Sequence, residues 1–348
     1  MAAYPNPSNI SPAKEAGQVD FLRRQFRVSP PAVTSADVDL KGKTAIITGG
    51  NSGLGFHSGA ELLGLGLSRL IITARDEAKG KAAMKALSDK KPSGTSVEVW
   101  PLNLSDYDSI TSFVERVKTL DHLDIFIQNA AAFAVEFRTH PSTQHEEVIQ
   151  VNYLSNALLC ILLLPVIAAN KAKTAPTRIV WVNSETAAWA KFKEKNSSTS
   201  LLASLDKKPS SFDFIERYST SKLLCQLFIV ELTKRVPPSV AVITLVNPGF
   251  CWGSGLHHET NGISGGILAA TKRLVGRSSP IGARTLTDAA VKHGEEVHGQ
   301  YLGDCRLKPM APLIYKPEGA KIAKKLWEET MIELAPFKAS EVLAEVTS

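Results

Sequence analysis

Tyr218 and Lys222 are the first pair of residues whose types and spacing suggest chemistry. They stand four positions apart in the segment YSTSK (218–222), where an apolar stretch with helical spacing begins. Residues at positions i and i+4 share one face of a helix, so the phenol and the ammonium group can interact. A phenol ionises only near pH ~10, but an adjacent cation favours the phenolate and brings the pKa of Tyr218 toward the range useful for proton exchange. The spacing alone is weak evidence, because it occurs by chance in many helices.

A glycine-rich turn is the second candidate site. The segment TGGNSGLG (48–55) follows an expected strand and opens an expected helix. Glycine lets the backbone turn tightly and lets a ligand approach the main chain, and a helix N-terminus offers free N–H groups to a pyrophosphate. Three glycines often form a turn without a ligand, but their place between strand and helix favours a bound dinucleotide. The candidate binding residues are Gly49, Asn51, Ser52, Gly53, Leu54 and Gly55.

The end of the second expected strand bears on which dinucleotide binds. An NAD enzyme usually places an acidic residue there to bind the ribose 2′-hydroxyl. This chain has Arg75 at that point, and its first acid, Asp76, comes one residue later. A guanidinium pairs with a 2′-phosphate, whereas a carboxylate repels it. Arg75 therefore favours NADP(H) over NAD(H); the alternative is a solvated arginine at the start of a helix.

Short β-branched runs alternate with helical stretches from residue 43 onward. Near-continuous apolar runs are typical of strands that are buried on both faces of a parallel sheet, and right-handed crossovers then produce a doubly wound sheet, the Rossmann fold. The expected strands are 44–47, 70–73, 97–102, 123–127, 178–182 and 240–246. The expected helices are 54–67, 76–89, 106–119, 143–170, 219–235, 281–292 and 317–334.

We predict a single α/β domain with three parts. Residues 1–40, which are rich in proline, form an N-terminal extension, of which Phe21 to Val28 packs on the domain. Residues 41–250 form the NADP-binding Rossmann core with the catalytic residues, including an insert at 185–217. Residues 251–348 form a substrate loop and a variable C-terminal substrate lobe of the same domain.

Composition excludes several classes of protein. With 40 Lys and Arg against 34 Asp and Glu, the chain of 348 residues has a formal net charge of +6, and its basic residues lie in small separate groups. We therefore expect no nucleic-acid partner, because such proteins concentrate their charge in one stripe. Four widely spaced cysteines without a CxxC pair suggest a reducing compartment.

Nothing in the sequence predicts secretion or a membrane span. The N-terminus lacks the basic start and the apolar core of a secretory signal. The longest apolar run, 157–169, has 13 residues, short of the roughly 18 that suggest a span. We expect a cytoplasmic protein in which this run is a buried helix.

Taken together and in order, these motifs resemble the short-chain dehydrogenase/reductase family. TGGNSGLG (48–55) is similar to the family's TGxxxGxG turn, and YSTSK (218–222) is similar to its YxxxK motif. Ser184 ends an expected strand as the family's catalytic serine does, and Asn152 stands where its structural asparagine stands. NPG (247–249) is similar to the motif that closes over the nicotinamide.

A narrower resemblance points to one branch of the family. The segments 218–223, 248–251 and 299–302 are similar to the retinol-dehydrogenase-like branch, especially its fungal members. This implies a fungal reductase, with a role in secondary metabolism as one expectation.

The resemblance also implies roles for individual residues. Tyr218 exchanges a proton with the substrate oxygen, Lys222 lowers the pKa of Tyr218 and holds the nicotinamide ribose, and Ser184 hydrogen-bonds the carbonyl. Asn152 positions a water that links Lys222 to solvent. The implied cofactor contacts further include Asn103, Leu104, Asn129, Ala130, Pro248 and Gly249, beside Tyr218, Lys222 and Arg75.

Three departures from the family pattern qualify these expectations. The chain has QNAA (128–131) where the family usually has NNAG, so Ala131 adds a methyl group near the expected cofactor path. Asn103 replaces the usual aspartate that binds the adenine, and its amide oxygen can still accept a hydrogen bond. Ser184 and Tyr218 are 34 positions apart, 218 − 184. Carbonyl reductases with such an insert tend to be monomeric, so we expect a monomer or a homodimer.

The segment after residue 250 carries two further candidates. His257 and His258 are adjacent, but no carboxylate or cysteine stands nearby at a supporting spacing, so we expect no metal site. A substrate contact or a solvated loop explains them better. A set of apolar residues could cover a lipophilic substrate or could be ordinary packing: Phe250, Trp252, Leu256, Ile263 and Ile267.

The sequence thus predicts an NADP(H)-dependent reductase or dehydrogenase that acts on a ketone or aldehyde of a lipophilic small molecule, with Tyr218 as proton donor. One alternative is a protein of the same fold that works as a redox-silent cyclase, isomerase or lyase, as the QNAA segment suggests. The other is a non-catalytic NADP-binding protein, for which a proton-transfer set would have no evident use.

Overall fold

The computed structural model describes residues 4–89, 94–169, 175–253 and 273–347. These residues form one eight-stranded sheet in the order β10-β9-β6-β5-β4-β1-β2-β3, in which β10 pairs antiparallel with β9 and the other pairs are parallel. The strands are β1 (Thr44–Ile47), β2 (Arg69–Ala74), β3 (Ser96–Pro101), β4 (Ile125–Gln128), β5 (Thr177–Val182), β6 (Ala241–Asn247), β9 (Tyr301–Gly303) and β10 (Arg306–Lys308). The first six correspond to the six predicted strands, and the predicted doubly wound fold is confirmed.

Both faces of the sheet are covered, which explains why its central strands are mostly apolar. Along β1, Ile46 belongs to one hydrophobic core, whereas Ala45 and Ile47 belong to the other. Successive side chains of a strand point to opposite faces, so a strand between two cores needs an apolar residue at every position. All four residues of β1 are buried.

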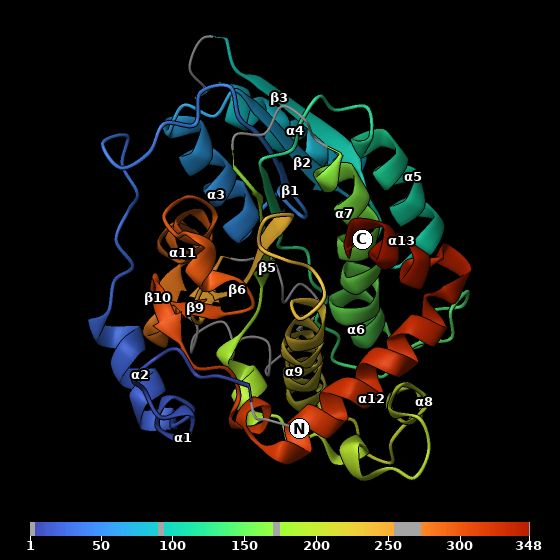
Figure 1. The fold of residues 1–348 in the computed structure, drawn as a ribbon. Helices are drawn as coiled ribbons and strands as arrows, with labels where there is room; N and C mark the ends of the chain where they lie inside the picture. The colour runs from blue at the N-terminus through green and yellow to red at the C-terminus, as the bar shows by residue number, and fades with distance from the viewer. Residues whose placement is uncertain (1–3, 90–93, 170–174, 254–272, 348) are drawn as a thin grey trace.

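In the described part of the chain, three helices pack on one face of the sheet and a larger group packs on the other (Figure 1). The first set is α3 (Gly53–Gly64), α4 (Glu77–Ser88) and α11 (Ser279–Val291). The second comprises α5 (Tyr107–Val117), α6 (Glu147–Ile149), the π-helical turn η1 (Gln150–Leu154), α7 (Ser155–Ala168) and α9 (Phe214–Leu232). In Figure 1, α3 and α11 lie to the left of β1 and β5, and α5 and α7 lie to their right.

The C-terminal lobe covers the helices of the second face. It contains η5 (Pro312–Tyr315), α12 (Pro317–Glu333), η6 (Ala335–Phe337) and α13 (Ala339–Thr347). Helix α12 packs on α9, where Trp327 stacks on Phe228 with ring centroids 5.3 Å apart. Helix α13 packs on α7. The lobe also contributes β9 and β10 to the sheet, so it is an integral part of the domain.

The predicted insert forms short helices. They are η2 (Glu185–Trp189), η3 (Lys193–Asn196) and α8 (Leu201–Leu205). Of these, η2 packs on α9 and α8 docks on α12 of the lobe. The Glu329 carboxylate of α12 accepts hydrogen bonds from Ser200 and from the backbone N–H groups of Leu201 and Leu202, at 2.7 to 3.0 Å. One carboxylate thus satisfies donors at the N-terminus of α8 that its own helix leaves unpaired.

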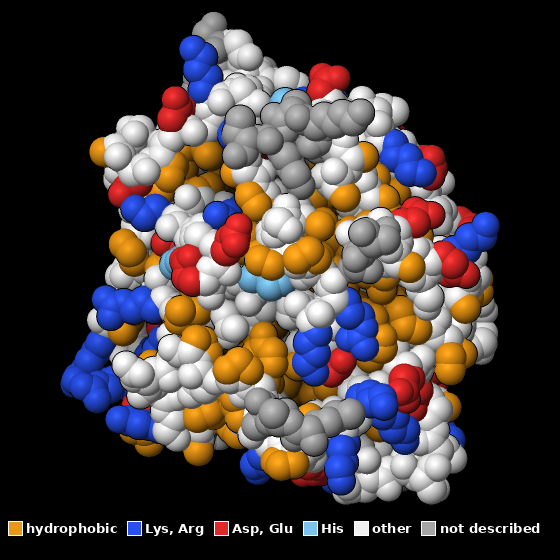
Figure 2. Space-filling model, viewed as in Figure 1, with side chains coloured by type: hydrophobic (Ala, Val, Ile, Leu, Met, Phe, Trp, Pro, Cys, Tyr) orange, Lys and Arg blue, Asp and Glu red, His pale blue; other side chains and the backbone are white. Residues whose placement is uncertain are grey.

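The remaining elements lie at the ends of the chain and beside β6. The N-terminal extension forms α1 (Pro12–Glu15) and α2 (Gln18–Arg27), and α2 includes most of the predicted packing segment 21–28. A two-stranded sheet pairs β7 (Cys251–Trp252) with β8 (Arg277–Ser278), and η4 (Glu295–Val297) precedes β9. On the face in Figure 2, the Lys and Arg side chains form several separate groups with Asp and Glu between them.

One helical stretch, residues 147–168, is long and apolar enough to cross a membrane. Of its most apolar window, 78% is buried inside the protein, between the sheet and the C-terminal lobe. This stretch is therefore a core helix, as the sequence predicts for 157–169. It begins four residues later than predicted and contains the π-helical turn, which sequence periodicity does not indicate.

Candidate active site

The glycine turn lies at the carboxyl end of β1, where ligands bind in open α/β sheets. Gly49 and Gly53 have φ values of +63° and +55°, a backbone conformation that residues with a Cβ rarely adopt. The Asn129 amide, at the end of β4, donates to the backbone carbonyls of Thr48 and Gly49 at 2.9 and 3.2 Å. A Cβ on Gly55 would lie 2.7 Å from that amide nitrogen. Because residue 55 is a glycine, the Asn129 side chain at the end of β4 has room to hydrogen-bond the turn and hold it in place.

The start of α3 fits the pyrophosphate of a dinucleotide. Ser52 is the N-cap residue, its side chain makes no cap hydrogen bond, and it is exposed. Asn51, Gly53 and Leu54 beside it are partly exposed. The first N–H groups of α3 are thus approachable from the edge of the sheet, and an anion would receive both their hydrogen bonds and the positive end of the helix dipole.

The predicted ribose-binding residue stands at the end of β2. Arg75 is exposed there, immediately before α4. The neighbouring acid, Asp76, caps α4 by accepting a hydrogen bond from the Lys79 N–H at 3.0 Å. The Asp76 carboxylate is therefore used as the N-cap of α4. Arg75 is the residue at the end of β2 whose positive charge suits a phosphate.

The expected adenine contacts lie after β3. The Asn103 side chain accepts a hydrogen bond from the Ser105 N–H at 3.2 Å, which forms a local turn. The Leu104 side chain is buried in the core, and its carbonyl accepts a hydrogen bond from Ser155. Asn103 thus stands at the surface of the site, whereas Leu104 can reach a ligand only with its backbone.

The first residue of the QNAA segment faces away from the cofactor edge, whereas Ala131 at its end is partly exposed, and the effect of its methyl group on the cofactor stays a prediction. The Gln128 side chain points into the core and donates to the Asn156 carbonyl at 2.8 Å. Asn129 holds the glycine turn, and the Ala130 N–H donates to the Thr48 hydroxyl at 3.0 Å. The substituted glutamine therefore packs against α7 rather than facing the cofactor edge.

Tyr218, Ser184 and Lys222 converge at the carboxyl end of β5. Tyr218 and Ser184 lie close enough for their hydroxyl groups to interact, and the Lys222 nitrogen lies 5.6 Å from the centroid of the Tyr218 ring. That nitrogen donates to the Val182 carbonyl at 3.0 Å. The Ser184 oxygen accepts from the N–H and the hydroxyl of Thr186 at 3.2 and 3.0 Å. Because it accepts twice, its own hydrogen is directed to a further acceptor.

Burial dominates the electrostatics of this group. It raises the pKa of Tyr218, and the interaction with Ser184 opposes part of that rise. Burial also lowers the pKa of Lys222, whose side chain is almost fully enclosed. The predicted lowering of the pKa of Tyr218 by Lys222 is therefore not found, because burial outweighs it; a further lowering by a cationic nicotinamide stays a prediction.

Asn152 lies on the π-helical turn and joins a loop of the site to the helix α9. Its amide donates to the Ala132 carbonyl and to the Ser221 hydroxyl, both at 3.0 Å, and its oxygen accepts from the Ala132 N–H at 2.7 Å. Ser221 immediately precedes Lys222. The side chain of Asn152 therefore positions the loop after β4 against the helix that carries the proposed proton donor.

The NPG segment closes the site after β6. Gly249 has a φ of +77°, and its N–H donates to the Asn247 side chain at 3.0 Å. Pro248 accepts a hydrogen bond from the Cys251 thiol. Of the predicted lid, Phe250 is partly exposed and Trp252 is 39% exposed. Leu256, His257, His258, Ile263 and Ile267 lie outside the described residues.

The comparisons with known proteins decide the family. The family model for short chain dehydrogenases matches residues 43–200. The short-chain dehydrogenase fogG of Aspergillus ruber is 46% identical over 342 residues, which cover 97% of this chain and 98% of that protein. This chain is a short-chain dehydrogenase. The short chain dehydrogenase/reductase mfmJ of Annulohypoxylon moriforme is 40% identical and covers 90% of each chain.

Solved structures support the fold of this short-chain dehydrogenase. The L-sorbose reductase of Gluconobacter frateurii, complexed with NADPH and L-sorbose, has a TM-score of 0.58 and 18% identity, covering 77% of this chain and 96% of that one. An NADP-bound 3-oxoacyl (acyl-carrier-protein) reductase of Agrobacterium tumefaciens has a TM-score of 0.56 and 17% identity, covering 77% and 95%. The chain is thus an oxidoreductase of a family that uses NAD(P) and acts on small molecules.

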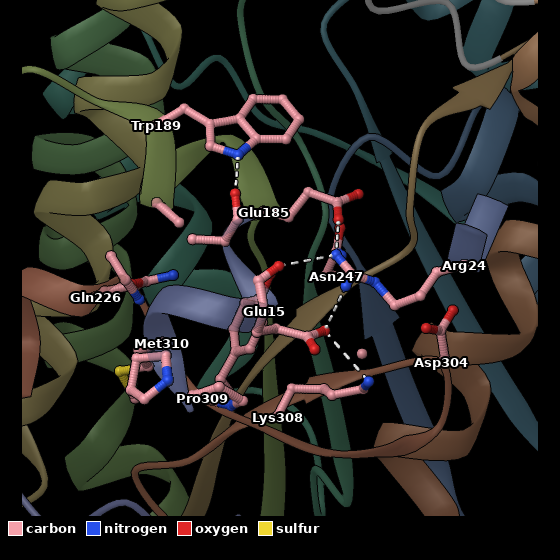
Figure 3. Close-up of a pocket in the computed structure, with 16 residues that line it drawn as sticks. Glu15, Arg24, Glu185, Trp189, Gln226, Asn247, Asp304, Lys308, Pro309 and Met310 are labelled. Atoms are coloured by element: carbon pink, nitrogen blue, oxygen red, sulfur yellow. Dashed lines mark hydrogen bonds and ion pairs between the residues drawn. The ribbon is translucent and has the colours of Figure 1, made fainter. Parts of the chain in front are cut away.

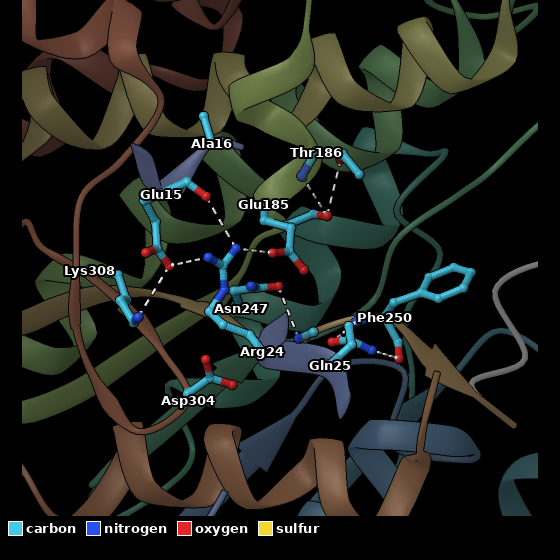
Figure 4. Close-up of polar contacts among 12 residues, drawn as sticks. Glu15, Ala16, Arg24, Gln25, Glu185, Thr186, Asn247, Phe250, Asp304 and Lys308 are labelled. Atoms are coloured by element: carbon cyan, nitrogen blue, oxygen red, sulfur yellow. Dashed lines mark hydrogen bonds and ion pairs between the residues drawn. The ribbon is translucent and has the colours of Figure 1, made fainter. Parts of the chain in front are cut away.

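The dehydrogenase site also contains residues that sequence reasoning missed. Phe133, in the loop after β4, lies 5.4 Å from the Tyr218 ring and 5.6 Å from Phe214, measured between ring centroids. Glu185 follows Ser184 and pairs with Arg24 of α2 at 2.9 Å (Figure 4). Phe133 stands near Asn129 in the sequence and Glu185 adjoins Ser184, so position alone could have drawn attention to both. Among the described residues, no group of three His, Cys, Asp or Glu side chains is placed to hold a metal ion.

Proposed function

We propose that this chain is an NADP(H)-dependent reductase that transfers a hydride to the ketone or aldehyde of a lipophilic small molecule, or oxidises the matching alcohol, in fungal secondary metabolism. The convergence of Tyr218, Ser184 and Lys222 at the edge where the glycine turn opens carries the proposal. The ring of Phe133 beside Tyr218 supports an apolar substrate. A cytoplasmic location, supported by four free cysteine thiols, and a monomeric or homodimeric state are part of the proposal.

In the mechanism, a bound nicotinamide supplies the hydride. Tyr218 gives its phenolic proton to the substrate oxygen on which charge develops, and Ser184 donates a second hydrogen bond to the same oxygen. Burial, which raises the pKa of Tyr218, keeps the phenol in the protonated form that reduction requires. Lys222 has three N–H donors, one of which bonds the Val182 carbonyl, so the others serve the nicotinamide ribose. Asn152 holds the segment next to Lys222 and positions the water that links Lys222 to solvent.

The experiment that tests this role is Tyr218→Phe. Turnover with NADPH and an aromatic or polyketide ketone should fall by roughly 10²–10⁴-fold, the usual contribution of a positioned proton donor, while NADPH binding stays within a few-fold. Tyr107→Phe on α5 is the matched control, because it removes a phenolic hydroxyl outside the site. Unchanged turnover in Tyr218→Phe would show that the mechanism is wrong.

The mass of the product separates the proposal from its main alternative. Reduction adds two hydrogens to the substrate, whereas cyclisation or isomerisation adds none. Because the Gln128 side chain points into the core, it gives less support to a redox-silent enzyme. A product with the mass of the substrate would nevertheless favour that alternative.

The preference for NADP(H) depends on Arg75. Charge-assisted hydrogen bonds contribute about 1.5–3 kcal/mol, so Arg75→Ala should weaken NADPH binding by roughly 10–100-fold and leave NADH binding unchanged. Lys79→Ala, which removes another exposed cation from the start of α4, is the control. Tighter binding of NADH than of NADPH by the unmodified chain would contradict the assignment.

A further inference from the structure

Helix α2 of the N-terminal extension is attached to the protein by its polar face. Arg24 and Gln25 point inward, and Gln25 is buried, whereas Val19 and Phe26 are 81% and 63% exposed. A surface helix ordinarily turns its apolar stripe to the core. Hydrogen bonds and ion pairs therefore help to determine where α2 sits, beside an edge-on contact of the Phe21 ring with Trp189. Those to Phe250 and Glu185 reach segments of the candidate active site.

Gln25 holds the loop that follows the NPG segment. Its amide nitrogen donates to the Phe250 carbonyl at 2.9 Å, and its amide oxygen accepts from the Phe250 N–H at 3.2 Å (Figure 4). The same nitrogen also donates to the Val275 carbonyl at 3.3 Å. A Cβ on Gly249 would lie 2.7 Å from the Gln25 oxygen. One side chain thus pairs both backbone groups of the residue that follows Gly249, and it does so at contact distance from that glycine.

Arg24 holds the segment that follows Ser184. Its guanidinium lies 2.9 Å from the Glu185 carboxylate and 3.2 Å from the Glu15 carboxylate, and Glu15 in turn lies 3.2 Å from the Lys308 nitrogen (Figure 3). The Arg24 and Glu185 side chains are only 13% and 15% exposed. A charge that is largely withdrawn from water needs its partner, so Arg24 constrains Glu185 and, through the backbone, Ser184.

Glu185 connects the two loops to each other. The Asn247 side chain lies close enough to the Glu185 carboxylate to favour its charged form and so to lower its pKa, and the oxygen of that side chain accepts from the Gly249 N–H. At the far end of η2, the Trp189 indole donates to the Ala16 carbonyl at 2.9 Å. The partly open pocket between the extension, η2 and the end of β6 has a volume of only about 20 Å³.

We propose that the N-terminal helix is a positioning element of the active site, in which Arg24 sets the segment that carries Ser184 and Gln25 sets the loop that carries Gly249. The inference rests on the proposed function of Ser184 and Gly249. It assigns catalytic importance to residues that precede the part of the chain matched by the family model, which begins at residue 43. Neither residue touches the reacting atoms, so both act through the segments that they hold.

The test compares Arg24→Met with Arg23→Met, a matched change at the adjacent and exposed position of the same helix, and with Gln25→Ala. Hydrogen–deuterium exchange of the amides at 184–189 and 248–252 is measured on each full-length variant, together with kcat, KM for NADPH and melting temperature. Arg24→Met should raise exchange at 184–189 and lower kcat by roughly tenfold, the effect of one hydrogen bond to a charged group. Gln25→Ala should raise exchange at 248–252 and raise KM for NADPH by a similar factor.

Arg24→Lys should recover part of the lost kcat, because it restores the charge next to Glu185 but not the forked geometry. The variants could instead lower the melting temperature while exchange at both segments and the kinetic constants stay unchanged. In that case α2 has only a structural role, and the inference is overturned. Identical behaviour of Arg24→Met and Arg23→Met would overturn it as well. If the unmodified chain binds no NADP(H) while the variants still loosen 184–189 and 248–252, the proposed function fails and the positioning of the loops stands.

Discussion

A buried histidine links the insert to the C-terminal lobe and makes stability depend on pH. The ring nitrogens of His145 lie 2.8 Å from the Asp206 carboxylate and 3.0 Å from the Glu333 carboxylate. Asp206 belongs to the insert and Glu333 ends α12. Since both ring nitrogens face acceptors, the doubly protonated imidazolium fits the site best. Burial lowers the pKa of His145, but the two carboxylates outweigh it and raise that pKa to about 9.

The size and sign of the effect follow from this shift. An unperturbed histidine has a pKa near ~6.5, so a rise of about 2.5 pH units in the pKa of His145 corresponds to about 3.4 kcal/mol. Solvent reaches the pair through Glu333, which is 31% exposed, and screening lowers the contribution to about 2 kcal/mol. Because the pKa is raised in the folded chain, this stabilisation is complete below pH ~6.5 and is lost as the pH rises through about 9.

Urea unfolding at pH 6.5 and pH 9.5 measures the effect in the unmodified chain and in His145→Gln. The free energy of unfolding of the unmodified chain should fall by about 2 kcal/mol more than that of the variant between the two pH values. Comparing the two proteins cancels the other titrating groups, such as Glu146, whose pKa burial raises to about 7. His140→Gln, at a partly exposed histidine nearby, should keep the full pH dependence. Equal losses in the unmodified chain and in His145→Gln would refute the reasoning.

Two further changes probe the packing around the site. Gly55→Ala places a methyl group 2.7 Å from the Asn129 amide, so it should lower the free energy of unfolding by about 1–3 kcal/mol and weaken NADPH binding. Gly64→Ala in the same helix meets nothing within 4 Å and should stabilise the chain; equal effects in urea unfolding would contradict the prediction. Phe228→Ala removes a fully buried ring that stacks on α12 and should cost about 3–5 kcal/mol, whereas Ile215→Ala, 55% exposed on the same helix, should change stability little.

The central strands were predictable because burial on both faces requires a nearly continuous run of apolar residues, which is visible in the sequence. A strand such as β5 must be apolar at nearly every position, and its predicted range, 178–182, differs from Thr177–Val182 by one residue. The hairpin of β9 and β10 shows no such apolar run. Its turn places Asp304 and Cys305 at positive φ without a glycine, and strands of three residues are too short to show a pattern.

The catalytic residue types were predictable because their chemistry restricts which residues can serve. The contacts that position them were not, because they join distant parts of the chain. Asn152 stands on a π-helical turn that no periodicity indicates, and its amide bonds to Ala132 and Ser221 exist only in the folded chain. Arg24 illustrates the same limit, since a basic residue on an extension reads as solvated surface until its pairing with Glu185 is seen.

A buried amide joins the C-terminal lobe to α9, the helix that carries Tyr218 and Lys222. Gln226, on α9, donates to the Asn183 side chain at 3.1 Å and accepts from the Ala311 N–H at 2.8 Å. Asn183 precedes Ser184 and itself donates to the Lys222 carbonyl at 3.0 Å. A buried polar group left unpaired costs about 1–3 kcal/mol, so a shift of the lobe at Ala311 is opposed at both ends of this connection. The lobe therefore constrains the placement of Ser184 and Lys222 from one side as the N-terminal helix does from the other.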